Sequence, residues 1–168
     1  MRYVVISRYE ERVQLEDICW HLSVAQEKMR EVFNAYLNRY TDEEVVDIPT
    51  EDKITEYRAT TDINNKRFDV YIIQVEQTSN YLVATFFNRD LENTREYSSE
   101  KEAYFKMEEY LIDYFQNDLE IEYDEEEFEK TRRKDWNITL NYAWCNKDED
   151  LFEVDIIKIK GDEKNENC

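Results

Sequence analysis

Carboxylates are the side chains that this sequence supplies most plentifully for chemistry. Eight of the thirteen residues from 118 to 130, DLEIEYDEEEFEK, are acidic. They belong to a longer window, Glu108 to Glu129, which contains eleven acids and no base. Two further base-free clusters occupy 42–52 (DEEVVDIPTED) and 148–155 (DEDLFEVD). Carboxylates at this density can hold a metal ion, act as an acid–base pair, or present negative charge to a basic partner.

Residues that would support nucleophilic or phosphate chemistry are scarce. The one histidine, His21, lies two residues from Cys19 in a segment expected to be helical, so the two side chains point to different faces. A Cys–His pair would therefore need Cys145 from elsewhere in the chain. The single glycine, Gly161, excludes the glycine-rich loops that cradle phosphates and dinucleotides. We expect no catalytic residues and no cofactor.

The acids do not form a recognisable metal-binding pattern. Asp69 and Glu76 are seven residues apart on an expected strand, so they face opposite sides of it. Neither DEEVVD nor NKDED matches the calcium loop of an EF-hand. We expect no metal ligands. A carboxylate- or metal-dependent hydrolase stays open as a second alternative, because two nearby carboxylates suffice for glycoside hydrolysis.

The net charge of −19 narrows the class of partner. It repels nucleic acid and anionic membranes and attracts basic surfaces, so we expect a basic protein partner that itself binds nucleic acid. No apolar run is long enough to span a membrane, and the N-terminus lacks the apolar core of a signal peptide. With three widely spaced cysteines, we expect reduced thiols and a cytoplasmic location, which is the host cytoplasm if a phage encodes the chain.

The acidic run divides into two parts. In 118–123 the acids alternate with apolar residues, so in a strand they line one face at intervals of about 6.7 Å. Duplex DNA has about one phosphate per 3.4 Å on each strand, so imitation of a duplex needs a second row of acids. We expect that row from the preceding helix or from 124–126. The predicted partner-binding residues are Glu108, Glu109, Asp113, Asp118, Glu120, Glu122, Asp124, Glu125 and Glu126.

The second part, 124–134 (DEEEFEKTRRK), has a structural explanation of its own. Asp124 is a good N-cap and Glu127 completes a capping box. Acids fill the first turn and four bases fill the last, an order that favours a short self-stabilised helix. The first part is therefore the better candidate for a surface that another protein recognises.

In overall character, the acid clusters on a small chain are similar to the acidic inhibitors that phages direct against restriction and CRISPR nucleases. The similarity is of composition and matches no motif. It implies a non-enzymatic inhibitor, an anti-defence protein that blocks a nucleic-acid-handling protein partly by DNA mimicry. The alternative is an acidic regulatory or scaffolding module that binds proteins without mimicry.

The elements expected to carry these residues follow from periodicity. Helical spacing covers 13–40, and a capping box at Ser99 and Glu102 begins a second amphipathic helix that ends near Asn117. The segments 53–60, 67–75 and 81–87 have short connections, which favour antiparallel hairpins. The expected strands are 2–8, 53–60, 67–75, 81–87, 138–144 and 151–160.

These elements predict one α+β domain over residues 1–160, followed by a flexible C-terminal tail, 161–168. We expect an antiparallel sheet of about five to six strands, with the long N-terminal helix and the second amphipathic helix packed on it. No internal repeat is evident from the residues alone.

Overall fold

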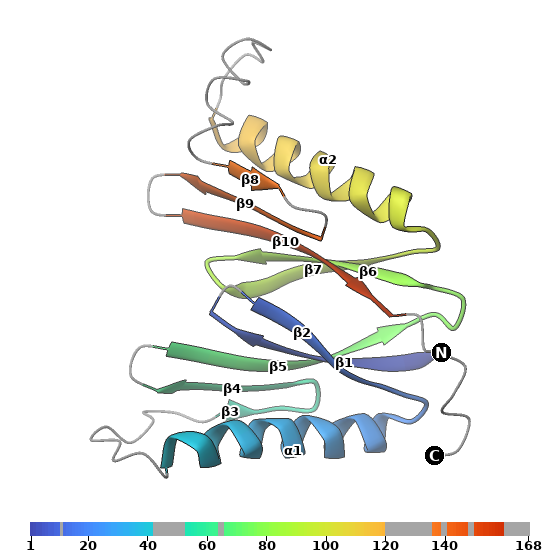
Figure 1. Ribbon diagram of the computed structural model, residues 1–168, viewed down its shortest axis with the longest axis vertical. Coiled ribbons are helices and arrows are strands. Elements are labelled where there is room, and N and C mark those ends of the chain that lie inside the picture. Colours follow the sequence, from blue (N-terminus) through green and yellow to red (C-terminus); the bar gives the residue numbers. More distant parts are fainter. Residues whose placement is uncertain are drawn as a thin grey trace. The chain divides into compact units, whose positions relative to one another are not determined.

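The computed structural model describes residues 1–10, 12–41, 53–63, 66–119, 136–138, 141–147 and 150–159. The described chain is α+β, with two helices and antiparallel sheets, as predicted. It divides into two compact units, Met1–Gln77 and Thr78–Lys160, each with its own sheet (Figure 1). The single sheet of five to six strands was therefore wrong. The single domain over 1–160 stays a prediction, and the tail 161–168 and the helix 124–134 lie outside the described residues.

Unit 1 is a five-stranded antiparallel sheet with one helix. The helix α1 covers one face and inserts Met29 and Phe33 among the side chains of the sheet. The strands lie side by side in the order β2-β1-β5-β4-β3. In chain order the elements are β1 (Arg2–Tyr9), β2 (Arg12–Cys19), α1 (Leu22–Thr41), β3 (Lys53–Ile54), β4 (Arg58–Ile63) and β5 (Lys66–Val75).

Unit 2 is built in the same way. The helix α2 packs on a five-stranded antiparallel sheet and buries Met107 and Leu111 against it. The spatial order of the strands is β7-β6-β10-β9-β8. In chain order the elements are β6 (Tyr81–Phe87), β7 (Asp90–Tyr97), α2 (Glu100–Leu119), β8 (Trp136–Ile138), β9 (Tyr142–Lys147) and β10 (Asp150–Lys158).

The two units have the same topology, strand-strand-helix-strand-strand-strand, in which the sixth element pairs with the first and the fifth and fourth follow it outward in the sheet (Figure 1). Tyr3 pairs with Cys19 in unit 1 and Tyr81 with Tyr97 in unit 2, so this part of the repeat is offset by 78 residues. Both helices are 20 residues long and start and end at that offset. The expectation of no internal repeat was wrong.

The last three strands repeat with a different offset. Arg58 pairs with Tyr71 in unit 1, and Tyr142 pairs with Asp155 in unit 2, which is an offset of 84. Identical residues then coincide at many equivalent positions, most of them buried. The identical pairs are Tyr3/Tyr81, Val5/Val83, Ala25/Ala103, Lys28/Lys106, Met29/Met107, Glu31/Glu109, Tyr36/Tyr114, Ile54/Ile138, Ala59/Ala143, Phe68/Phe152, Val70/Val154, Ile72/Ile156 and Ile73/Ile157.

The long N-terminal helix begins nine residues later than the expected 13–40. Residues 12–19 form β2, which pairs with β1 through a tight turn at Glu10, where φ is 54°. The equivalent turn between β6 and β7 has positive φ at Asn88 and Arg89, 46° and 74°, as expected for the two central residues of a type I′ hairpin turn. A strand-strand hairpin precedes the helix in each unit, and the sequence reading missed the second strand of both.

The other expected strands have mixed outcomes. β5, β6 and β10 match the predictions for 67–75, 81–87 and 151–160. Segment 53–60 instead divides between β3 and β4, and segment 138–144 between β8 and β9. β4 pairs with β5, as predicted, and β9 pairs with β10. β5 and β6 do not pair with each other, because they belong to different units.

Candidate functional sites

The start of α2 places the acidic residues of unit 2. The backbone N–H of Glu102 donates to the Ser99 hydroxyl at 3.3 Å, which confirms Ser99 as the N-cap. The Ser98 hydroxyl donates to the Glu102 carboxylate at 3.0 Å. Hydrogen bonds to the Glu102 carboxylate, from the side chain of Ser98 first and of Ser99 second, lower the pKa of Glu102. The start of the helix is therefore defined. Since Ala103, Met107 and Leu111 face the sheet, the acids on the other side of the helix face solvent.

Three of the predicted partner-binding residues have described side chains, all on α2. Asp113 is exposed, and Glu108 and Glu109 are half-buried. Asp118 lies in the last turn of α2, but its side chain is outside the description. The structure therefore places four of the nine predicted residues, Glu108, Glu109, Asp113 and Asp118, on one helix. Glu120, Glu122, Asp124, Glu125 and Glu126 lie outside the described residues.

Basic residues accompany the acids of α2. Lys106, which precedes the base-free window, makes an ion pair with Glu109. The guanidinium of Arg95 on β7 lies 5.9 Å from the centre of the Tyr110 ring. The window that is free of bases in sequence therefore has two bases beside it in space. Asp113 is the one predicted residue that is both described and exposed.

Comparison of the two units shows where unit 2 has acquired negative charge. Asp90 on β7 is exposed and takes the place of Arg12 on β2, since Phe87 pairs with Asp90 as Tyr9 pairs with Arg12. Glu92 is also exposed, but it lies at the β-bulge of β7, and Asn93 takes the place of Gln14. Asp113 on α2 replaces Ala35 of α1. We call Asp90, Glu92, Glu109 and Asp113 the acidic surface of unit 2. Because α2 contacts β7, these residues belong to packed neighbouring elements.

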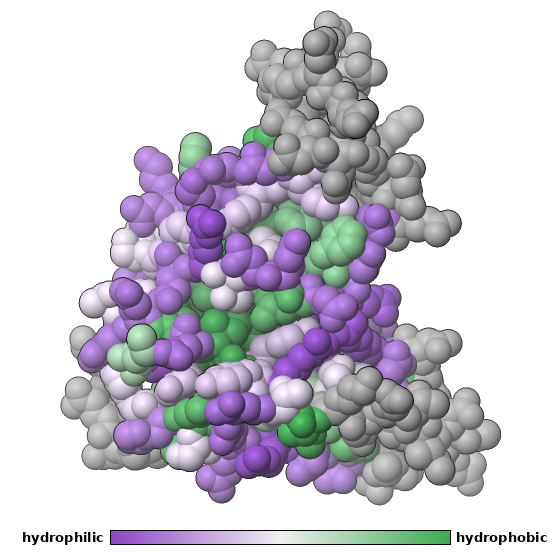
Figure 2. Space-filling view, turned by 180° about the vertical axis from the view of Figure 1, so that it is seen from behind, coloured by the Kyte–Doolittle hydropathy of each residue, from purple (hydrophilic) through white to green (hydrophobic). Residues whose placement is uncertain are grey.

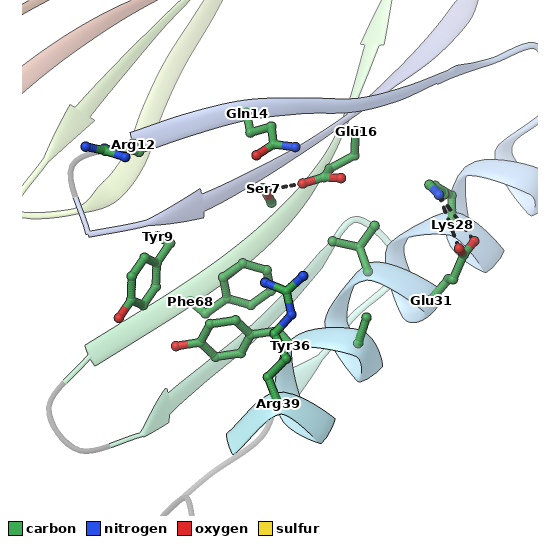
Figure 3. A pocket seen from close by; sticks show the side chains of 12 residues that line it. Ser7, Tyr9, Arg12, Gln14, Glu16, Lys28, Glu31, Tyr36, Arg39 and Phe68 are labelled. Carbon is green, nitrogen blue, oxygen red and sulfur yellow. Dashed lines mark hydrogen bonds and ion pairs between the residues drawn. The ribbon is translucent and has the colours of Figure 1, made fainter. Parts of the chain in front are cut away.

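Unit 1 has a cavity of about 620 Å³ at the corresponding place, between α1 and the β1-β2 hairpin (Figure 3). This volume is in the range of small-molecule sites, about 300–1,000 Å³. Both aromatic and charged side chains line it. They are Ser7, Tyr9, Arg12, Gln14, Glu16, Lys28, Glu31, Val32, Ala35, Tyr36, Arg39 and Phe68.

Three aromatic rings form the inner wall at one end of the cavity. Tyr36 is stacked on Phe68, with ring centres 3.9 Å apart and an angle of 8° between the planes. Tyr9 is tilted by 53° against Tyr36 at 5.6 Å. Unit 2 repeats this arrangement with Phe87, Tyr114 and Phe152, stacked at 4.4 Å and 7° and tilted at 54°. The three rings are therefore part of the repeated scaffold.

Charged side chains are divided between the two ends of the cavity. Figure 3 shows Arg12 and Arg39 at the end with the aromatic rings, where neither makes an ion pair with a described residue. At the other end Lys28 pairs with Glu31 at 3.3 Å, and the Ser7 hydroxyl donates to the Glu16 carboxylate. Lys28 and Arg39 are eleven residues apart on α1, which is about 16 Å along the helix.

Thiol and metal chemistry find little support among the described residues. Cys19 and Cys145 are buried free cysteines. Burial, followed by the charge of Asp17, raises the pKa of the Cys19 thiol to about 11, so almost none of it is thiolate at neutral pH. In the described ranges no three His, Cys, Asp or Glu side chains are grouped so that they could hold a metal ion. No described helix has both the length and the apolar composition needed to cross a membrane.

Comparisons with known proteins add no relative. No family model matches the chain, and no curated protein and no solved structure is significantly similar to it. The cavity of unit 1 was not predicted from the sequence. The repeat is the signal that could have revealed it, because Arg12 and Arg39 differ in charge from the equivalent residues of unit 2.

Proposed function

We propose that this chain is a small, non-enzymatic acidic protein that binds a basic, nucleic-acid-handling protein, such as a nuclease or a CRISPR or restriction effector. It blocks this partner partly by imitating the charge of nucleic acid. In this proposal it acts in the cytoplasm, which is the host cytoplasm if a phage encodes it. The proposed partner-binding residues are the nine acids from Glu108 to Glu126.

The observation that carries this proposal is the placement of charge in unit 2. The whole chain has a net charge of −19, and hydrophilic residues cover much of the side shown in Figure 2. On a scaffold that unit 1 also uses, unit 2 has Asp90 where unit 1 has Arg12, and Asp113 where unit 1 has Ala35, although β7 also has Arg95 where β2 has Asp17. The substitutions leave the fold unchanged, so they alter the surface rather than the core. Clustered carboxylates attract the Lys and Arg side chains with which a partner binds phosphates.

The geometry of α2 supports the mimicry part. Glu109 and Asp113 are one turn apart, with side chains about 6 Å from each other. This spacing is similar to that of acids on one face of a strand, about 6.7 Å. Either row alone is sparser than the phosphates of DNA. In this proposal the acids of α2, Asp118 among them, form one row, and Glu120 and Glu122 are predicted to add the second row that the imitation of a duplex requires.

The test is capture of partners from a host lysate by the immobilised chain. It is done at low salt and again at about 0.5 M salt, where interactions between exposed charges are largely screened. We expect a basic nucleic-acid-binding protein that is released at high salt and displaced by DNA or RNA. A partner retained in the presence of competing nucleic acid would instead identify an interaction module without mimicry.

Charge reversal tests the surface itself. Replacing Asp113, Glu120 and Glu122 together by Lys should weaken the complex and slow its formation, because it removes the complementary charge. The matched control reverses three acids of unit 1, Glu27, Glu56 and Asp62, all of them exposed. Both variants change the net charge equally. Equal effects would assign binding to net charge alone, and no effect of the first variant would remove these residues from the proposed surface.

A further inference from the structure

We propose that the cavity of unit 1 binds a small anion with a planar ring, of the nucleotide class, with its phosphate at Arg12 and Arg39. This site is separate from the proposed protein-binding surface of unit 2 and does not depend on it. The cavity lies wholly within unit 1, between α1 and the β1-β2 hairpin (Figure 3).

The two arginines identify the charge of the ligand. Arg12 and Arg39 are both exposed, and neither makes an ion pair with a described residue. They come from different elements, β2 and α1, and both line the same end of one cavity. A guanidinium offers a planar fork of donors that matches the oxygens of a phosphate or carboxylate.

The aromatic wall identifies the second part of the ligand. Tyr9 lines the cavity and is partly exposed, while Tyr36 and Phe68 are stacked behind it and hold its position. A planar ring gains offset or edge-to-face contacts with such a wall. At about 620 Å³ the cavity has room for a ring, a sugar and a phosphate rather than for phosphate alone.

The far end of the cavity orients the ligand. Glu16 is held by the Ser7 hydroxyl, and Glu31 by Lys28. These carboxylates repel a phosphate and accept hydrogen bonds from hydroxyl or amino groups. A nucleotide therefore binds with its phosphate toward Arg39 and with its sugar hydroxyls or exocyclic amino groups toward Glu16 and Glu31.

Unit 2 shows that the arginines are not required by the fold. It keeps the three stacked rings and the Lys–Glu pair of the helix. It has Asp90 at the position of Arg12 and Asn117 at that of Arg39. The scaffold is thus compatible with the loss of both bases. We expect one nucleotide site per chain, in unit 1.

Isothermal titration of the full chain with AMP, GMP and UMP tests the site. Adenosine and inorganic phosphate are titrated separately, so that the contributions of the ring and of the anion can be resolved. The variants Arg12→Asn and Arg39→Asn remove the proposed phosphate ligands. Arg30→Asn is the matched control, since Arg30 is exposed on α1 and does not line the cavity.

We expect one equivalent of nucleotide to bind, with adenosine and phosphate each binding more weakly. Arg12→Asn and Arg39→Asn should each weaken binding about tenfold or more, as expected for loss of a charge-assisted hydrogen bond, and Arg30→Asn should not. A thermal melt confirms that each variant is folded. Absence of binding by the wild-type chain to all three nucleotides, or equal weakening by Arg30→Asn, would overturn the proposal.

Discussion

Met29 and Met107 provide a direct test of the repeat, because the structure places them at equivalent positions of the two cores. Both side chains are fully buried, one in the core of unit 1 and the other in the core of unit 2. Their immediate surroundings are also repeated, since Ala25 and Ala103 lie one turn earlier on the same helices. Replacement of either methionine by alanine should therefore destabilise the protein to a similar extent.

The expected cost follows from the atoms removed. Methionine to alanine deletes three heavy atoms, which at about 0.8 kcal/mol for each CH₂-sized group is about 2.4 kcal/mol of lost transfer free energy. A residual cavity of roughly 50 Å³ adds about 1.2 kcal/mol at ~24 cal/mol per Å³. The free energy of unfolding should thus fall by about 3.6 kcal/mol for each variant, within the ~2–5 kcal/mol seen for such substitutions.

Urea denaturation measures this loss, and amide hydrogen exchange locates it in one unit or in both. If residues 1–160 are one cooperative domain, Met29→Ala and Met107→Ala shift the same single transition. Two transitions, with each variant shifting only its own, would replace that prediction by two domains. A cost below about 1 kcal/mol for either variant contradicts the packing described for its helix.

Three further predictions concern single side chains. Asp69→Ala should lower the free energy of unfolding by about 3 kcal/mol in urea denaturation, because this buried carboxylate binds two arginines, at 2.9 and 2.8 Å, that would lose it; a loss below ~1 kcal/mol would show that solvent replaces it. Cys19, with its pKa raised to about 11, should react with iodoacetamide at pH 8 far more slowly in the native protein than in urea, as followed by mass spectrometry of its peptide; equal rates would contradict its burial. Glu102, whose pKa is lowered from 4.5, should contribute stability that is present above pH 4.5 and lost as the pH falls through the lowered pKa, so Glu102→Gln should flatten the acid limb of the stability curve; an unchanged limb would refute the contribution.

The elements that sequence predicts well are those with a strong local signal. α2 has a capping box and an uninterrupted apolar stripe, and its start at Glu100 follows directly from Ser99. β5 and β10 are nearly continuous apolar runs bounded by polar residues, as central strands should be. In each of these cases, packing reinforces the preference of the local residues.

The second hairpin strands were missed because each is an edge strand of its sheet. β2 and β7 have one neighbour each, and few of their residues are buried. In β2 the polar–apolar alternation covers only residues 12–16, and Ile18 and Leu22 also fit helical spacing, so β2 was absorbed into the helix that begins at Leu22. The turn after β1 gave no warning, because Glu10 has positive φ without being glycine or asparagine; the turn after β6 carries one such signal, Asn88.

The repeat was missed because its identities are sparse and its period changes. The offset is 78 residues through the helices and 84 in the last three strands, so no single period aligns the halves. Most identical residues are buried, where shape is restricted. The exposed positions of the two units differ in charge, so the charge pattern of the sequence does not show the repeat.

The repeat also separates structural from functional candidates among the acids. Lys28 with Glu31 and Lys106 with Glu109 form the same helical ion pair in both units. An exposed pair of this kind contributes at most a few tenths of a kcal/mol, but its recurrence marks it as part of the scaffold. Glu109 is therefore a weaker candidate for partner binding than Asp113, which has replaced an alanine and has no counterpart in unit 1. The same reasoning favours Arg12 and Arg39 over Lys28 in the cavity, so the positions where the two copies differ in charge are the ones to mutate first.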